Sequence, residues 1–148
     1  MNWFIFYFVI MKYTDAVIAE KNGTLMKLDG NDNFVVCEPF IWFVDYEEKT
    51  GKILVPTGFV TDLGSIPPFF RAFFSRNGST AYILHDWLYH NGGKIPQEYG
   101  LLILSRRHAD RIMYQALRVA GIGVVSAFFQ YLGVRLGGWN AWRAKCKK

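Results

Sequence analysis

The sequence is poor in the residues that carry the simplest assignments of function. It has two cysteines, Cys37 and Cys146, and no C-x-x-C pair. It therefore offers no disulfide framework, which favours a reducing compartment. It has no phosphate-binding loop and no G-x-G-x-x-G, which excludes the common nucleotide-binding signatures. Ser65, in DLGSIP, could act as a nucleophile, but no G-x-S-x-G elbow surrounds it.

Long apolar runs are also absent. Segment 2–11, NWFIFYFVIM, is too short to span a bilayer and lacks the positive region of a secretory signal. It suits either a strand packed on the core or a stretch upstream of a translation start at Met11. Segment 121–134, GIGVVSAFFQYLGV, has no charge over fourteen residues and predicts a buried helix. We therefore expect neither a signal peptide nor a transmembrane helix.

What is present is a large supply of core-forming residues. Of the 148 residues, 51% are hydrophobic and 18% aromatic, which suits one globular domain. The net charge of +5 comes partly from the tail 143–148, RAKCKK. A basic terminus of this kind favours solubility, and no stripe of basic and aromatic residues indicates nucleic-acid binding.

The pattern along the chain changes near residue 66. Before it, apolar runs separated by turn residues predict antiparallel strands and hairpins, with strand ends or bulges at Pro39 and Pro56. After it, helices are predicted over 67–74, 81–90, 106–120 with Ser105 as cap, and about 124–136, while 94–100 reads as a loop. The prediction is a single α+β domain over 12–142, with an apolar extension at 1–11 and a basic tail at 143–148.

Ionisable side chains interrupt the predicted core at three places. Helical spacing puts His85 and Asp86 in one stripe with Tyr82 and Tyr89. Asp110 shares a face of the next helix with Met113, Tyr114 and Leu117, and Asp62 follows a predicted strand. Burying such groups is costly unless each is paired or binds something.

One interpretation is a metal-dependent catalytic site. Asp62, His85, Asp86 and Asp110 form a mostly oxygen ligand set that suits one divalent ion, namely Mg²⁺, Mn²⁺, Fe²⁺ or Zn²⁺. The candidate catalytic residues are Asp62, His85 and Asp86. A bound metal would generate hydroxide for hydrolysis.

The alternative interpretation is structural. Asp62 would cap a turn, and His85 would hydrogen-bond a carbonyl. Asp86 would pair with an arginine among Arg71, Arg106, Arg107 and Arg111. Asp110 would sit favourably near the start of its helix. His90 and His108 flank helix ends and are expected to be exposed, and Trp139 and Trp142 to anchor the packing beneath the basic tail.

Four motifs in this chain together resemble a known family. They are VPTGFVTDLGSIP, LHDWLY, ADRIMYQALRVAGI and RLGGWNAW, between about residues 40 and 142. They are similar to an uncharacterised phage and prophage family, domain of unknown function 1353. Its motif positions fall on Asp62, Ser65, Pro67, His85, Asp86, Trp87, Tyr89, Ala109 and Asp110. The resemblance implies a phage origin and a location in the host cytoplasm or the virion, but no activity.

Three classes of function follow. The first is a hydrolase that uses a metal-bound water to attack an amide or ester. The second is a non-enzymatic virion component or host-interaction protein, whose Asp/His cluster would be a structural network with a phage or host protein as partner. The third is weak membrane association through 2–11 and the basic tail.

Overall fold

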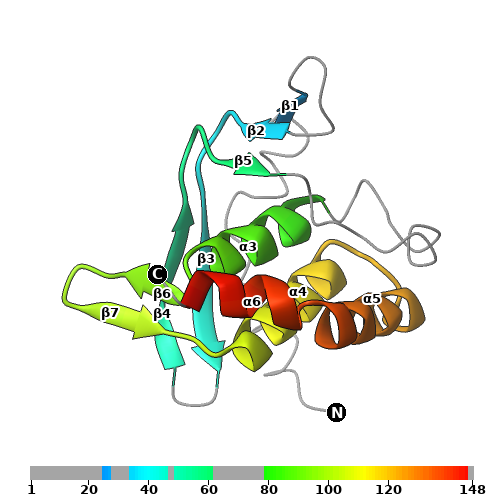
Figure 1. Cartoon of the computed structure of the whole chain (residues 1–148). Coiled ribbons are helices and arrows are strands. Elements are labelled where there is room, and N and C mark those ends of the chain that lie inside the picture. The colour runs from blue at the N-terminus through cyan, green and yellow to red at the C-terminus, as the bar shows by residue number, and fades with distance from the viewer. Residues whose placement is uncertain (1–24, 28–33, 47–48, 62–78, 147–148) are drawn as a thin grey trace, which may run out of the picture.

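The fold is described from a computed structural model, for residues 25–27, 34–46, 49–61 and 79–146. Within these ranges, short antiparallel strands fill the N-terminal half and helices fill most of the C-terminal half (Figure 1). The predicted α+β class is therefore confirmed. The predicted helix at 67–74, and Asp62 and Ser65 with it, lie outside the described residues.

The longest strands form one antiparallel hairpin. Strand β3 (Phe40–Tyr46) pairs with β4 (Lys49–Val55), with Phe40 opposite Val55 and Tyr46 opposite Lys49. Alternate side chains face the core: Phe40, Trp42 and Val44 from β3, and Ile53 and Val55 from β4. This period of two is what a sheet with one buried face requires.

A second small sheet continues from the ends of this hairpin. It has the order β1–β2–β5, made of β1 (Leu25–Lys27), β2 (Phe34–Val36) and β5 (Val60–Thr61), all antiparallel. Pro39 lies just before β3 and Pro56 just after β4. The prediction that these prolines mark strand ends is confirmed, because proline has no amide hydrogen to donate to a ladder.

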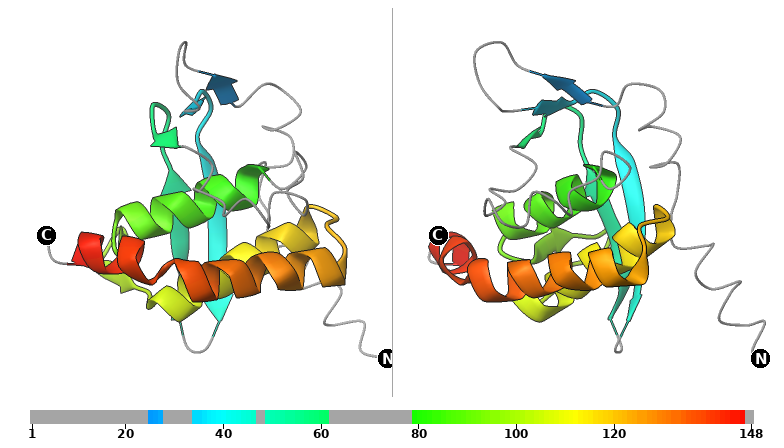
Figure 2. Two further views of the ribbon diagram at one scale, coloured as in Figure 1. Left: turned by 45° about the vertical axis from the view of Figure 1, so that its right-hand side comes forward. Right: turned by 90° about the vertical axis from the view of Figure 1, so that its right-hand side faces the viewer.

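Four helices are described: α3 (Ser79–His90), α4 (Arg106–Val119), α5 (Val124–Gly137) and α6 (Trp139–Cys146). The first three match predicted helices, whereas α6 was not predicted. Helix α3 contacts β4, α4 and α6, and α5 packs on α4. The two central helices thus lie between the β3–β4 hairpin and the C-terminal helices (Figure 2).

The predicted loop between α3 and α4 is a hairpin instead. Strands β6 (Lys94–Pro96) and β7 (Leu101–Ile103) pair with Lys94 opposite Ile103. The Gln97 side chain ties this hairpin to β4, accepting from the Lys52 amide at 2.9 Å and donating to the Lys52 carbonyl at 2.7 Å. Each strand has three residues, and one of them contains a proline. Such strands are too short for the alternation of apolar and polar residues to identify them in the sequence.

The expectation that the uncharged segment 121–134 forms a buried helix is wrong. Helix α5 buries Ala127, Gln130 and Gly133, which are its small and polar residues. It exposes larger apolar ones, listed here: Val124, Val125, Phe128, Phe129 and Leu136. Among the described helices, none is both long and apolar enough to cross a membrane.

Candidate active site

The local sequence fixes the position of α3. The helix ends at Asn91–Gly92–Gly93, where the Gly93 amide donates to the Leu88 carbonyl at 2.9 Å. Gly93 has φ +74°, and a Cβ there would lie 2.0 Å from the Leu104 carbonyl oxygen. Only glycine therefore fits. The end of α3 therefore packs against the backbone of Leu104, which follows β7 and precedes α4. This contact fixes the position of α3 relative to α4.

The start of α4 is capped as predicted. The Ser105 hydroxyl accepts from the His108 amide at 3.3 Å, while the His108 Nδ1 accepts from the Ser105 amide at 3.1 Å. This reciprocal pair is a capping box with histidine in the place of the usual Glu or Gln. His108 therefore has a structural role, and Asp110 lies two residues further along the helix.

Asp110 is fully buried and surrounded by hydrogen-bond donors. Its Oδ1 lies 2.9 Å from the His85 Nε2 and accepts from the Tyr89 hydroxyl at 2.7 Å. Its Oδ2 accepts from the Arg135 Nη1 at 2.8 Å, and the Arg106 Nη1 lies 3.6 Å from the same oxygen. The carboxylate thus joins α3, α4 and α5.

These contacts decide the ionisation of Asp110. Burial alone would raise its pKa, but the hydrogen bond and charge of His85, and then the bonds from Tyr89 and Arg135, lower the pKa below its ordinary value of 3.8. Each donor stabilises the charged form. Asp110 is therefore ionised at neutral pH, and its oxygens act only as acceptors.

An ionised Asp110 in turn fixes the tautomer of His85. The ring nitrogen facing a carboxylate must carry a hydrogen, so the Nε2 of His85 is the donor. In the neutral ring, Nδ1 then holds the lone pair. Nδ1 has no hydrogen-bond partner in the described part of the chain, and the side chain keeps about a tenth of its surface exposed. A carboxylate-oriented imidazole with an available lone pair is the arrangement of a general base.

Tyr89 restrains both members of this dyad. Its ring packs against the imidazole of His85 at 4.2 Å between centroids. Burial, followed by the nearby negative charge of Asp110, raises the pKa of the Tyr89 phenol far above its usual value of 10.0. The hydroxyl therefore remains a donor at any physiological pH. A Cβ on Gly138 would lie 2.4 Å from that hydroxyl, so the turn between α5 and α6 closes over it.

The structure separates the predicted site residues into two groups. His85 and Asp110 meet, but Asp86 faces β5, where its Oδ2 accepts a hydrogen bond from the Thr61 hydroxyl. Consecutive helix residues point about 100° apart, which explains why neighbours in sequence diverge here. Asp62 lies outside the described residues.

Two observations bear on the predicted metal. Asp110 does not suit a cation, because two guanidinium groups already neutralise it. Within the described ranges, no three His, Cys, Asp or Glu side chains gather as a metal site would require.

The other predicted residues near α3 lie as follows. His90 is exposed, as expected, and stacks on Trp87 at 5.9 Å. The buried indole nitrogen of Trp87 has no hydrogen-bond partner among the described residues. Trp142 packs on Tyr89 at 5.1 Å and anchors α6, whereas Trp139 stands half exposed between Arg106 and Arg143.

Sequence reasoning missed the arginines of the site. Arg106 was considered as a partner of Asp86, yet it pairs with Asp110 at the i, i+4 spacing, which the sequence does show. Arg135 was not considered. It is the single charged residue of α5, and a lone charge in a long uncharged run is a signal that a buried partner exists.

Fold and contacts together define an α+β domain whose two central helices share a buried histidine–aspartate dyad. A family model described as "Protein of unknown function (DUF1353)" matches residues 35–134, more than half of the chain. The chain therefore belongs to this family, as its motifs predicted. Comparison with the curated proteins gave no match, and neither did comparison with the solved structures.

Proposed function

We propose that the protein is a hydrolase in which His85 is the general base. The observation that carries the proposal is the contact between the His85 Nε2 and an ionised, buried Asp110 oxygen, which leaves the Nδ1 lone pair for a proton. Imidazole also titrates nearer to neutral pH than other side chains.

The reaction that suits these groups is hydrolysis of a carboxylic ester. The His85 Nδ1 takes a proton from a water molecule as the water oxygen bonds to the ester carbonyl carbon. The tetrahedral intermediate then expels the alkoxide, and the same proton passes from Nδ1 to that alkoxide. Water and ester give a carboxylic acid and an alcohol, with Asp110 holding the imidazolium throughout.

The test compares activity with folding in paired variants. The wild type is assayed on soluble short-chain nitrophenyl esters beside His85→Gln and His90→Gln, the second altering an exposed histidine of the same helix. We expect His85→Gln to lower kcat by about 10²–10⁴-fold, as loss of a general base does, and His90→Gln to leave it unchanged. A wild type inactive on all esters, or a fully active His85→Gln, would overturn the proposal.

A divalent cation is a separate proposal, and we place it at Asp86. The Asp86 carboxylate and the Thr61 hydroxyl offer oxygen donors, which favours Mg²⁺ or Ca²⁺ over softer metals. Because Asp86 faces away from the dyad, this cation is independent of the proposed hydrolysis. We expect calorimetry to detect Mg²⁺ or Ca²⁺ binding to the wild type and weaker binding to Asp86→Asn. A wild type that binds neither ion would exclude the cation.

The second candidate is a non-enzymatic protein, and the two arginines on Asp110 favour it. With both oxygens engaged, the cluster would lock α3, α4 and α5 together, and partner binding would be the function. His85→Gln distinguishes the candidates. Under the structural reading it lowers Tm and removes no activity, whereas under the catalytic reading it removes an activity that His90→Gln retains.

The setting we propose is a phage or prophage. The support is the likeness of the four motifs to that family. In a host carrying the gene, DNA damage that induces prophages should raise the protein together with virion proteins in a proteomic time course. Constant abundance through induction would contradict a phage role.

A further inference from the structure

Helix α5 has several large apolar side chains that are exposed to solvent. Val124, Val125, Phe128, Phe129 and Leu136 cover roughly 140° of the helix at 3.6 residues per turn. Their exposure is high, with Leu136 at 74%, Val125 at 67% and Phe128 at 50%. A contiguous patch of this kind on a small protein marks an interaction site. We call these five residues with Trp139 the α5 face.

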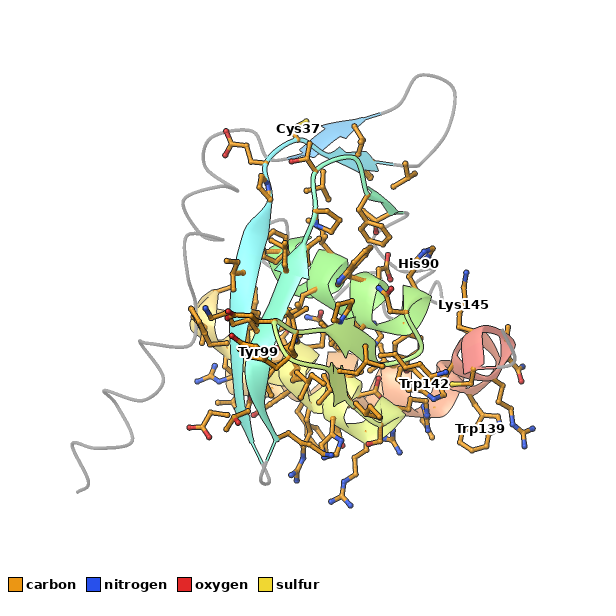
Figure 3. The ribbon with its side chains drawn as sticks, turned by 90° about the vertical axis from the view of Figure 1, so that its left-hand side faces the viewer. Cys37, His90, Tyr99, Trp139, Trp142 and Lys145 are labelled. Atoms are coloured by element: carbon orange, nitrogen blue, oxygen red, sulfur yellow. The ribbon has the colours of Figure 1, made fainter. Side chains whose placement is uncertain are left out.

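Helices α5 and α6, which carry the α5 face, contain no aspartate or glutamate. Residues 111–148 contain seven lysines and arginines and no aspartate or glutamate. Helix α6 carries Arg143 and Lys145, and its Trp139 lies half exposed between the guanidinium groups of Arg106 and Arg143, at 5.1 and 4.8 Å. Figure 3 shows Trp139 and Lys145 projecting outward from α6 while Trp142 points toward the helices. The partner of such a surface is anionic and apolar together.

Positive charge beside apolar side chains distinguishes among three possible partners: a second copy of the chain, a nucleic acid and a lipid bilayer. A second copy would bring the same excess of positive charge against it, which opposes self-association. A nucleic acid matches the charge and could stack on Phe128 and Trp139, but it would leave the exposed aliphatic Val124, Val125 and Leu136 without an apolar partner. An anionic lipid bilayer has phosphates for the basic groups and acyl chains for the aliphatic ones. Tryptophan also concentrates where those two layers meet.

We propose that the α5 face docks on the surface of anionic phospholipid bilayers, and that the ester the protein hydrolyses belongs to a bilayer lipid. The second half rests on the proposed hydrolase. The docking surface and the dyad are physically joined, because Arg135 of α5 bonds Asp110 and Arg106 contacts both Asp110 and Trp139. Hydrolysis of the lipid ester follows the steps given above and releases a fatty acid and a lysolipid.

Docking is tested with the full chain and vesicles of phosphatidylglycerol and phosphatidylcholine. Sedimentation should recover the wild type with anionic vesicles and leave it in solution with pure phosphatidylcholine. The variant Phe128→Gln/Leu136→Gln should lose at least tenfold in affinity. Its matched control, Leu101→Gln/Ile103→Gln, alters two side chains of β7 with comparable exposure of 58% each and should bind as the wild type.

Charge is tested by a second matched pair. Arg143→Glu/Lys145→Glu reverses two charges of α6, and Lys52→Glu/Lys94→Glu reverses two exposed lysines of the strands. We expect Arg143→Glu/Lys145→Glu to weaken vesicle binding and to reduce the dependence of that binding on salt. We expect Lys52→Glu/Lys94→Glu to change neither. Equal loss in both pairs would show nonspecific attraction, and equal binding of face and control variants would overturn the docking proposal. Binding of RNA with higher affinity than vesicles would overturn it in favour of a nucleic-acid partner.

A final experiment separates the two proposals. Fatty-acid release from anionic vesicles is measured for wild type, His85→Gln and Phe128→Gln/Leu136→Gln. We expect His85→Gln to sediment with vesicles and release nothing, and the face variant to hydrolyse soluble esters while sparing vesicles. A wild type that binds vesicles but cleaves no ester refutes the hydrolase and leaves docking intact. One that cleaves soluble esters and ignores vesicles refutes docking alone.

Discussion

Helices α4 and α5 pack on each other and have the same length of fourteen residues, yet α4 buries several large apolar side chains and α5 buries none. Helix α4 places an ionised Asp110 among Ile112, Met113 and Leu117 in the interior. Helix α5 buries Gln130 and turns Phe128 outward. The two helices are joined, because the interior carboxylate of α4 accepts a hydrogen bond from Arg135 of α5. Arg135 lies only about 20° around the helix from Val124 and from Phe128, and its side chain keeps 28% of its surface exposed, so it reaches Asp110 from the edge of the apolar face.

The sharpest way to break this arrangement is Asp110→Ala. The change removes the acceptor of three hydrogen-bond donors and leaves two guanidinium groups without their counter-charge, at a cost of about 3 kcal/mol. For a domain of this size that is roughly 10 °C in Tm. Thermal unfolding followed by circular dichroism measures it, with the exposed Glu98→Ala as the control. A Tm within 2 °C of the wild type would show that Asp110 does not hold the helices.

A smaller loss is expected from Gly138→Ala. The added Cβ would approach the Tyr89 hydroxyl at 2.4 Å and the Val134 carbonyl oxygen at 2.7 Å, and neither moves freely. Overpacking of this kind costs about 1–3 kcal/mol. Gly137→Ala is the matched control, because a Cβ there meets nothing within 4 Å. The urea midpoints of the wild type and Gly137→Ala should both be higher than that of Gly138→Ala. Equal midpoints would contradict the close approach of Gly138 to Tyr89.

Acid should weaken the contact between α4 and α5 before alkali does. The pKa of Asp110 is lowered in the fold, so its contribution to stability is complete above the unfolded value of about 3.8 and is lost as pH falls below it. The pKa of Tyr89 is raised, so its contribution is lost only above pH 10.0. Urea midpoints between pH 7 and 2.5 should fall more steeply for the wild type than for Asp110→Ala. Parallel curves would remove Asp110 from the linkage.

The smallest effect on stability is expected at the α5 face. Phe128→Ser and Leu136→Ser remove side chains that already contact water, so the free energy of unfolding should change by less than about 0.5 kcal/mol. Urea denaturation of Phe128→Ser and Met113→Ser measures the contrast, because Met113 is a fully buried residue of α4. We expect the larger loss of stability at Met113. A large loss at Phe128 would show that the chain itself covers this face.

The α+β class, the helices α3, α4 and α5, the Ser105 cap and the strand ends at Pro39 and Pro56 could be predicted from the sequence. Each depends on periodicity or on the chemistry of one residue. The β6–β7 hairpin and α6 could not, because three-residue strands and an eight-residue helix are too short to show a period.

Polarity in the sequence led to His85 and Asp110 but not to their arrangement. Their separation from Asp86 depends on which way α3 faces, and that is set by packing against β4, α4 and α6. The orientation of α5 was predicted wrongly for a related reason. Hydropathy counts the apolar residues of α5 but does not show which residues are buried, and these are Ala127, Gln130 and Gly133.

The positions of the dyad and its donors along the chain have a consequence for folding kinetics. His85 and Arg135 each lie 25 residues from Asp110, and Tyr89 lies 21. Loops of that length close at modest entropic cost, and local contacts favour fast folding. We expect hydrogen exchange to show α3, α4 and α5 protecting their amides together, as one cooperative unit. The dyad and its donors would then assemble within a single contiguous stretch of chain, before the strands that precede them have completed their pairing.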